Sequence, residues 1–129
     1  MANRIEPGKR PRSSMAPALV FGPDGKLLLV VGSPGGSEII NYVALTLIAV
    51  LDWRYDIQAA VGLLHVSNRN GSTDIESGPG ADALAAELRA RGHGVVLRKL
   101  ESGLHGIMRT RRGLEGGADP RREGVALGD

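Results

Sequence analysis

Hydrophobic residues along this chain fall in short runs whose period changes from one segment to the next. Two apolar runs, residues 18–22 and 26–32, are rich in Val and Leu and are separated by Pro23-Asp24-Gly25. Proline, aspartate and glycine supply the backbone geometry of a tight turn. The pattern therefore predicts a β-hairpin in which both strands are substantially buried.

The longest apolar segment, residues 38–53, has the period of a helix. Its apolar side chains recur at i, i+3 and i+4, and further Leu and Val residues widen the apolar face. Ser37 is a natural N-cap, because its hydroxyl can accept a hydrogen bond from the first turn, and Glu38 suits the positive end of the helix dipole. We expect this helix to be covered on most sides, as one packed against a sheet would be. It is too short to span a bilayer of roughly 30 Å.

The second half of the chain alternates short helical and β-like patterns. The clearest amphipathic stretch has alanine and leucine on one side and charged residues on the other. The expected elements are a helix at 56–65 capped by Asp56, a turn at 67–71, a short strand at 72–78, a helix at 79–94, and strands at 95–100 and 105–111. The glycine-rich segment 113–129 is predicted to consist of turns.

This order of elements indicates a fold class. Hairpin-connected strands with helices grouped between them predict an α+β fold, a mainly antiparallel sheet with covering helices, and not a doubly wound parallel sheet. With 129 residues, the chain is expected to form a single domain. Residues 1–17 carry three prolines and several charges, so we expect an irregular arm there, followed by an α/β body at 18–129.

Composition excludes several classes of function. The chain has no cysteine, and therefore no disulfide, thiol nucleophile or cysteine-based metal site. A net charge of +2 does not require a polyanionic partner. The one basic cluster, Lys9, Arg10 and Arg12, is short and lacks the interleaved aromatics of a nucleic-acid site, so a solvated arm or an arm along a partner is favoured. Residues 1–12 lack the apolar core of a signal peptide.

Titratable residues give only weak signals. His65, His93 and His105 show neither H-x-x-x-H nor H-E-x-x-H spacing, so each is predicted to be a surface or turn residue. We therefore expect no metal site, and no cofactor motif is present. Asp119 and Arg121 flank a proline and could orient a loop through a carboxylate–guanidinium contact.

Residues 32–37, Gly-Ser-Pro-Gly-Gly-Ser, allow two interpretations. They lack the lysine of a P-loop and the spacing of a dinucleotide fingerprint. Gly35 and Gly36 precede a helix, so their N–H groups could face a small developing charge such as a tetrahedral oxyanion. Alternatively, the glycines serve only a strand-to-helix turn that needs positive φ.

Ser13 and Ser14 form the second candidate site. Adjacent hydroxyls beside cationic side chains can bind a carboxylate. Neither serine is an obvious nucleophile, because no G-x-S-x-G motif surrounds them. An ordinary polar turn is the alternative.

These segments, in this order, resemble the gamma-glutamyltransferase family. In that family K-R-P-x-S-S-M-x-P leads into a hairpin, then G-S-P-G-G, then a helix ending in a D-[WY]-like pair; here residues 9–17 read KRPRSSMAP and residues 32–36 read GSPGG. The stretch ADALAAELRARGHGV and the closing GGADPRREGVALGD also look like the C-terminal part of its small subunit. The resemblance implies part of an N-terminal-nucleophile hydrolase fold, a four-layer αββα sandwich.

The resemblance also implies an activity and site residues. In the family, a proenzyme cleaves itself and the exposed threonine attacks the γ-glutamyl carbonyl of glutathione-like substrates; water or an amine then resolves the glutamyl-enzyme. By this resemblance Ser13 and Ser14 contact the glutamyl α-carboxylate, and Gly35 and Gly36 line the oxyanion hole.

The family's nucleophile lies in a T-T-H segment upstream of K-R-P-x-S-S-M, whereas Thr46, Thr73 and Thr110 stand in other contexts. We therefore expect a C-terminal fragment of the enzyme that is inactive alone. Its expected partners are a γ-glutamyl substrate such as glutathione, the remaining small-subunit segment and the large subunit, with no nucleic acid and no membrane span. For the complete enzyme the resemblance implies a periplasmic or extracellular location. A non-catalytic remnant or small interaction domain is the alternative.

Overall fold

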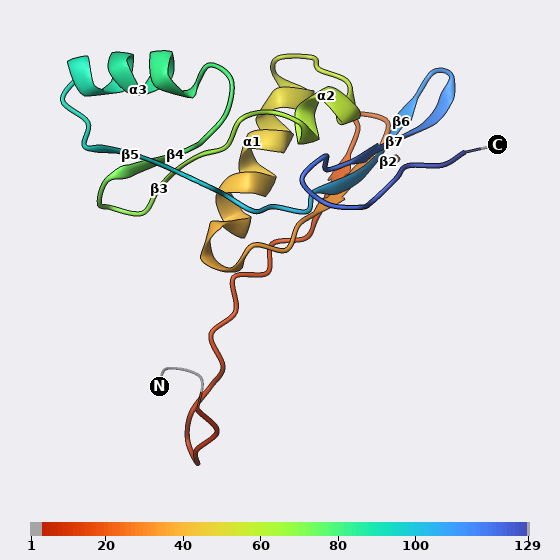
Figure 1. The fold of residues 1–129 in the computed structure, drawn as a ribbon. Helices are drawn as coiled ribbons and strands as arrows, with labels where there is room; N and C mark the ends of the chain where they lie inside the picture. Colours follow the sequence, from red (N-terminus) through yellow and green to blue (C-terminus); the bar gives the residue numbers. More distant parts are fainter. Residues whose placement is uncertain (1–3, 129) are drawn as a thin grey trace.

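The computed structural model describes residues 4–128, so the first three residues of the predicted arm, and Asp129, lie outside the described residues. Residues 4–17 form no helix or strand and extend away from the body (Figure 1). No helix in the described part is long and apolar enough to cross a membrane. In chain order the elements are β1 (Ala18–Phe21), β2 (Leu27–Gly32), the 3₁₀ turn η1 (Gly36–Glu38), α1 (Ile39–Leu51), α2 (Ile57–Val61), β3 (Val66–Asn68), β4 (Thr73–Glu76), α3 (Ala81–Ala90), β5 (Val95–Arg98), β6 (His105–Thr110) and β7 (Gly113–Ala118).

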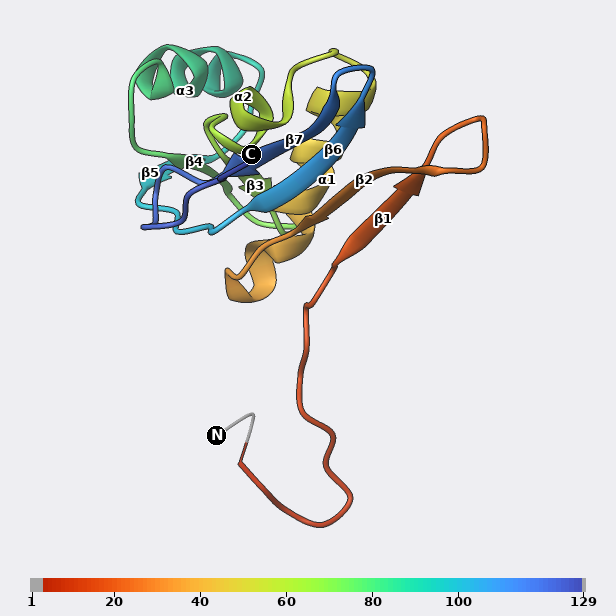
Figure 2. The same ribbon diagram turned by 90° about the vertical axis from the view of Figure 1, so that its right-hand side faces the viewer.

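The larger sheet has four antiparallel strands in the order β1-β2-β6-β7. The predicted hairpin is confirmed, and its turn is closed by the Gly22 N–H, which donates to Lys26 O at 2.8 Å. Helices α1 and α2 cover one face of this sheet (Figure 2). The main core lies between this sheet and the two helices. It includes Leu29, Tyr42, Ile57 and Leu104, each at most 2% exposed.

No helix of the described residues covers the other face of this sheet, which corrects the expectation that both hairpin strands are substantially buried. Leu19 and Phe21 of β1 are 65% and 61% exposed, whereas Val20, between them, packs against the core. Successive side chains of a strand point to opposite faces, so helices on one face leave every second residue in solvent. The apolar side chains of β1 on that outer face are therefore exposed in this chain, whereas Ala126 lies close to Gly116 of β7.

The smaller sheet has the order β3-β4-β5 and lies on the far side of α1 from the β1–β2 hairpin (Figure 1). Strands β3 and β4 are antiparallel, whereas β4 and β5 are parallel and are connected through α3. Ile75, Ala81 and Ala85 form its buried cluster. The mainly antiparallel α+β prediction is confirmed, with this one parallel pair as the exception.

Helix starts show one confirmed and one wrong prediction. Asp56 caps α2, accepting a hydrogen bond from the Ala59 N–H at 2.7 Å. Ser37 does not cap α1: the chain first makes the η1 turn, and the N-cap position is Glu38, without a side-chain cap. The Ser37 hydroxyl instead accepts a hydrogen bond from Arg69 Nη1 at 2.7 Å.

The turn prediction for residues 113–129 is wrong at its start, because β7 occupies Gly113–Ala118. Glycine is a poor strand former, but here it allows a close approach by α2. A methyl group on Gly117 would lie 2.9 Å from Ile57 C and O, and one on Gly106 would lie 2.8 Å from Ile57 Cδ1. The glycines that suggest turns therefore let a helix pack directly on the strand backbone.

Candidate functional site

A cavity of about 390 Å³ lies where the N-terminal arm passes the start of α1. It joins two segments that are about twenty residues apart in the sequence. Three of the predicted site residues, Ser13, Ser14 and Gly36, line it together. Gly35 lies directly before Gly36 but is not part of the lining. The lining residues are Arg12, Ser13, Ser14, Met15, Gly36, Ser37 and Ile39.

The two glycines have left-handed backbone conformations, with φ of +137° at Gly35 and +58° at Gly36. A methyl group on Gly35 would lie 2.6 Å from Tyr42 Cε2, whereas one on Gly36 would meet nothing within 4 Å. Within residues 4–128, neither glycine N–H donates a hydrogen bond to another part of the chain. The positive-φ turn is therefore present, and it also leaves two donors unpaired next to the cavity.

The hydroxyl groups of the cavity can act as donors. Ser13 Oγ accepts from the Met15 N–H at 3.3 Å, so its own proton is not used by that bond. Ser37 Oγ accepts from Arg69 in the same way. Arg12 is the only charged residue in the lining. A wall of hydroxyls, one guanidinium and an unpaired backbone N–H favours a negatively charged ligand.

Glu38, next to this wall, does not present its charge to the cavity. It is 7% exposed and does not line the cavity. Its carboxylate pairs with Arg69 Nε at 2.9 Å and accepts a hydrogen bond from Ser67. Arg12, Ser37 and Arg69 were not predicted as site residues. Arg12 could have been found from its place beside Ser13, but no local pattern links Arg69 to Ser37 across 32 residues.

His65 corrects the prediction that each histidine is a surface or turn residue. It is 1% exposed, and its ring packs against the Tyr42 ring at a tilt of 32°, with centroids 4.2 Å apart. Its Nε2 lies 2.7 Å from Ser102 Oγ. Burial, with a contribution from the positive charge of Arg121, lowers the pKa of His65 to about 4. The imidazole is thus neutral near pH 7.

The predicted contact between Asp119 and Arg121 is confirmed, with Nη1 3.0 Å from Oδ1. Asp119 is fully buried and also accepts hydrogen bonds from Ser102 and from the Leu104 N–H. Burial alone raises the pKa of Asp119, but these hydrogen bonds and those from Arg121 outweigh it and hold the pKa below its ordinary value. None of these residues lines the cavity.

Residues 4–128 contain no group of three or more His, Asp or Glu side chains placed to hold a metal ion.

Comparison with known proteins shows which family the sequence resembles. The sequence model of the family described as Gamma-glutamyltranspeptidase matches residues 1–129. The glutathione hydrolase proenzyme of Pseudomonas aeruginosa is 37% identical over 131 residues, covering 98% of this chain and 23% of that protein. The corresponding Escherichia coli proenzyme is 37% identical over 123 residues, covering 93% of this chain and 21% of that protein.

Solved structures agree with the sequence matches. The gamma-glutamyltranspeptidase from Pseudomonas nitroreducens, complexed with L-DON, superposes with a TM-score of 0.81 and 31% identity. That match covers 100% of this chain and 69% of the other chain. The chain therefore spans 21–23% of the length of the curated relatives named above, and a larger part of the one solved chain.

Proposed function

Because this chain belongs to the gamma-glutamyltranspeptidase family, we propose that it supplies one wall of a site for γ-glutamyl transfer or hydrolysis. Ser13 and Ser14 bind the α-carboxylate of the glutamyl group. The N–H groups of Gly35 and Gly36 stabilise the oxyanion of the tetrahedral intermediate. The observation that supports this most directly is the single cavity lined by Ser13, Ser14 and Gly36, with the Gly36 N–H unpaired beside it.

The reaction proceeds through two acyl transfers. A threonine hydroxyl adds to the γ-carbonyl carbon, its proton passes to a base, and the carbonyl π electrons move onto oxygen, where the glycine N–H groups stabilise them. Collapse breaks the C–N bond, the amine leaves with a proton, and a glutamyl ester remains. Water or an amine then adds to the ester and releases the threonine.

The attacking threonine comes from another segment of the complete enzyme. This chain has three threonines, and none lines the cavity. Thr46 is buried and donates to Tyr42 O at 3.0 Å, Thr73 Oγ1 accepts from Asn68, and Thr110 lies at the β6–β7 turn. We therefore expect residues 1–129 alone to bind γ-glutamyl compounds weakly and to turn none over.

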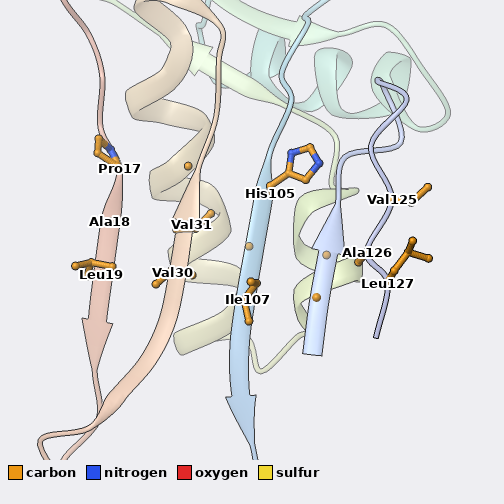
Figure 3. Close-up of a pocket in the computed structure, with 14 residues that line it drawn as sticks. Pro17, Ala18, Leu19, Val30, Val31, His105, Ile107, Val125, Ala126 and Leu127 are labelled. Carbon is orange, nitrogen blue, oxygen red and sulfur yellow. The ribbon is translucent and has the colours of Figure 1, made fainter. Parts of the chain in front are cut away.

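The bare face of the four-stranded sheet is the surface on which the rest of the enzyme packs. Leu19, Val30, Ile107 and Gly116 are cross-strand neighbours and form one apolar row across all four strands. A groove of about 490 Å³ runs over this row, and residues 125–127 lie beside it (Figure 3). A contiguous exposed apolar surface of this kind marks an interface.

The occupant we propose is the apolar face of a second β-sheet. Side chains from two facing sheets interdigitate at about 10 Å separation, which matches a flat apolar row better than a helix would. The match covers 69% of the chain of the solved relative, so the remainder of that chain is long enough to supply such a sheet. Residues 18–128 are in this proposal one part of a larger domain, and residues 4–17 are an arm that reaches the active site.

A chimera tests the proposal. Residues 1–129 replace the matching 131-residue region of the Pseudomonas aeruginosa proenzyme, and hydrolysis of a chromogenic γ-glutamyl anilide is measured. We expect turnover, and loss of glutamate binding in the Ser13→Ala/Ser14→Ala double variant. Ser72→Ala, an exposed serine away from the cavity, is the matched control. A folded chimera without turnover would favour the alternative, a non-catalytic remnant.

A further inference from the structure

Behind the glycine pair lies a buried polar cluster that takes no part in the proposed chemistry. It consists of His65, Ser102 and Asp119, which are 1%, 0% and 0% exposed. His65 Nε2 lies 2.7 Å from Ser102 Oγ, and Ser102 donates to Asp119 Oδ2. Burying three polar side chains is costly, because each must be desolvated, and the hydrogen bonds between them offset that cost.

The hydrogen bonds fix where the protons are. The Ser102 hydroxyl has one proton, which goes to the Asp119 carboxylate. Its oxygen therefore accepts from His65, so Nε2 carries the proton and Nδ1 does not. Nδ1 is buried and has no hydrogen-bond partner in the described part of the chain. The pKa of about 4 agrees with a neutral ring.

One chain of contacts leads from this cluster to the glycines through Tyr42. Tyr42 is 2% exposed, and its ring packs against the His65 ring with centroids 4.2 Å apart. Tyr42 also lies close to Gly35, where an added methyl group would be 2.6 Å from Cε2. The Tyr42 ring thus contacts both His65 and Gly35 and connects the buried cluster to the glycine pair.

A second set of contacts runs through residues 101–103. The Gly103 N–H donates to Ser33 Oγ at 3.2 Å, and a methyl group on Gly103 would lie 2.7 Å from Pro34 Cγ. Glu101 O lies 3.4 Å from the position of a Cβ on Gly35. Ser102, between these two residues, is the member of the cluster bonded to both His65 and Asp119. Both routes therefore end at the same corner of the backbone.

We propose that Tyr42, His65, Ser102 and Asp119 are positioning residues that hold the Gly35–Gly36 N–H groups at the oxyanion position. This inference rests on the proposed function of the glycines. The N–H groups matter most when charge develops on the carbonyl oxygen, and a misplacement of 1 Å can cost about 10²-fold in rate. Loosening the cluster therefore lowers kcat and leaves KM almost unchanged.

The test compares variants in the chimera that differ in one property. His65→Leu removes the donor to Ser102, whereas His65→Gln keeps an N–H near the position of Nε2. Tyr42→Leu removes the flat ring, whereas Tyr42→Phe keeps it. We expect kcat to fall about 10–10²-fold in the two Leu variants, with KM within about twofold, and to stay within about threefold in the Gln and Phe variants. His93→Leu, at an exposed histidine, changes neither constant.

A second readout is independent of turnover. The Glu38 N–H donates to Gly35 O at 3.2 Å and so reports whether the corner is closed. In residues 1–129, we expect its hydrogen exchange to accelerate at least about tenfold in the two Leu variants, with the β6–β7 amides unchanged. Unchanged Glu38 exchange, or a rise in KM in place of a fall in kcat, overturns the inference. If the unmodified chimera is inactive, the proposed function fails, and Glu38 exchange alone then decides whether the cluster holds the Gly35–Gly36 corner in place.

Discussion

Arg121 and Glu76, 45 residues apart in the sequence, form a doubly hydrogen-bonded ion pair, with Nε 2.5 Å from Oε1 and Nη2 2.6 Å from Oε2. The same guanidinium contacts Asp119 and the carbonyl oxygens of Val61 and Leu63. One side chain thereby connects β4, the end of α2 and the segment after β7. Its side chain is 16% exposed, so the pair is largely shielded from water.

Arg121→Ala should destabilise the chain by about 3–5 kcal/mol, because it leaves the buried carboxylate of Asp119 and the partly buried carboxylate of Glu76 without their counter-charge. Urea unfolding of residues 1–129 measures this. The matched control is Arg111→Ala, an exposed arginine at the β6–β7 turn, for which we expect a change within about 0.5 kcal/mol. Equal effects of the two substitutions would contradict a structural role for Arg121.

His65 should make stability depend on pH. Its pKa is 6.5 when unfolded and about 4 when folded, so the unfolded state binds the extra proton between these values. The stabilisation is complete above pH 6.5 and is lost as pH falls towards 4, by about 3 kcal/mol in total. Urea unfolding between pH 7.5 and 4 measures the slope.

His65→Gln should flatten the pH dependence in that window, because glutamine does not titrate. The remaining charged groups around the ring are Arg121, Glu76 and Asp119. Burial raises the pKa values of both carboxyl groups, but hydrogen bonds outweigh it and hold them below their ordinary range. The stability that these carboxylates contribute therefore begins to be lost at a lower pH than the stability contributed by His65. A slope between pH 6.5 and 4 that survives in His65→Gln would show that another group is responsible.

Alanine substitutions at the two adjacent glycines should differ in their effect on kcat. Gly36→Ala keeps the N–H and meets open space, so it costs only the left-handed backbone, about 1 kcal/mol, and kcat in the chimera stays within about threefold. Gly35→Ala drives a methyl group into the Tyr42 ring, and kcat falls about 10²-fold. Equal kcat values for both variants would mean that the corner does not hold an oxyanion.

Arg12→Ala should weaken substrate binding and leave kcat unchanged. Arg12 is the one charged residue of the cavity, and we expect KM to rise about tenfold at low ionic strength and less at high salt. Arg10→Ala, two residues away and outside the lining, is the matched control. A salt-independent KM in the unmodified chimera would argue against an electrostatic role.

Ile107→Lys tests whether the outer face of the larger sheet is an interface in the complete enzyme or only an exposed surface. Ile107 is 49% exposed in β6, so unfolding of residues 1–129 should change by less than about 0.5 kcal/mol. In the chimera the same lysine would be buried against a second sheet, and stability should fall by at least about 2 kcal/mol. Val96→Lys, at 44% exposure in β5, is the control, and similar effects of both in the chimera would contradict the interface.

The sequence allowed much of this fold to be predicted, because its signals are local. The Pro23-Asp24-Gly25 turn and the period of residues 38–53 are complete within their own segments, and both elements are confirmed. The family resemblance and the α+β part of an N-terminal-nucleophile hydrolase fold are confirmed by the comparisons. Strand β7 could not be predicted from its own residues. Its glycines allow α2 to pack closely against the strand, and the pattern of residues 113–118 contains no sign of that distant helix.

The site was predictable in part for the same reason. The resemblance named Ser13, Ser14 and the two glycines, and the structure brings the serines and Gly36 to one cavity, while their roles stay a proposal. The burial of His65 was missed, because a histidine's partners, here Ser102 and Tyr42, come from distant segments. Side chains that meet only through the tertiary structure have no characteristic spacing in the sequence, so no motif reveals them.

The pairing of β2 with β6 has a consequence for synthesis of the chain. Gly32 lies opposite His105, so the central pair of the larger sheet joins segments more than seventy residues apart. A growing polypeptide must therefore carry its β1–β2 hairpin and the apolar helix α1 incomplete until the C-terminal hairpin has left the ribosome. During that interval the unpaired edge of β2 is open to pairing with other chains, which makes the incomplete chain prone to aggregation.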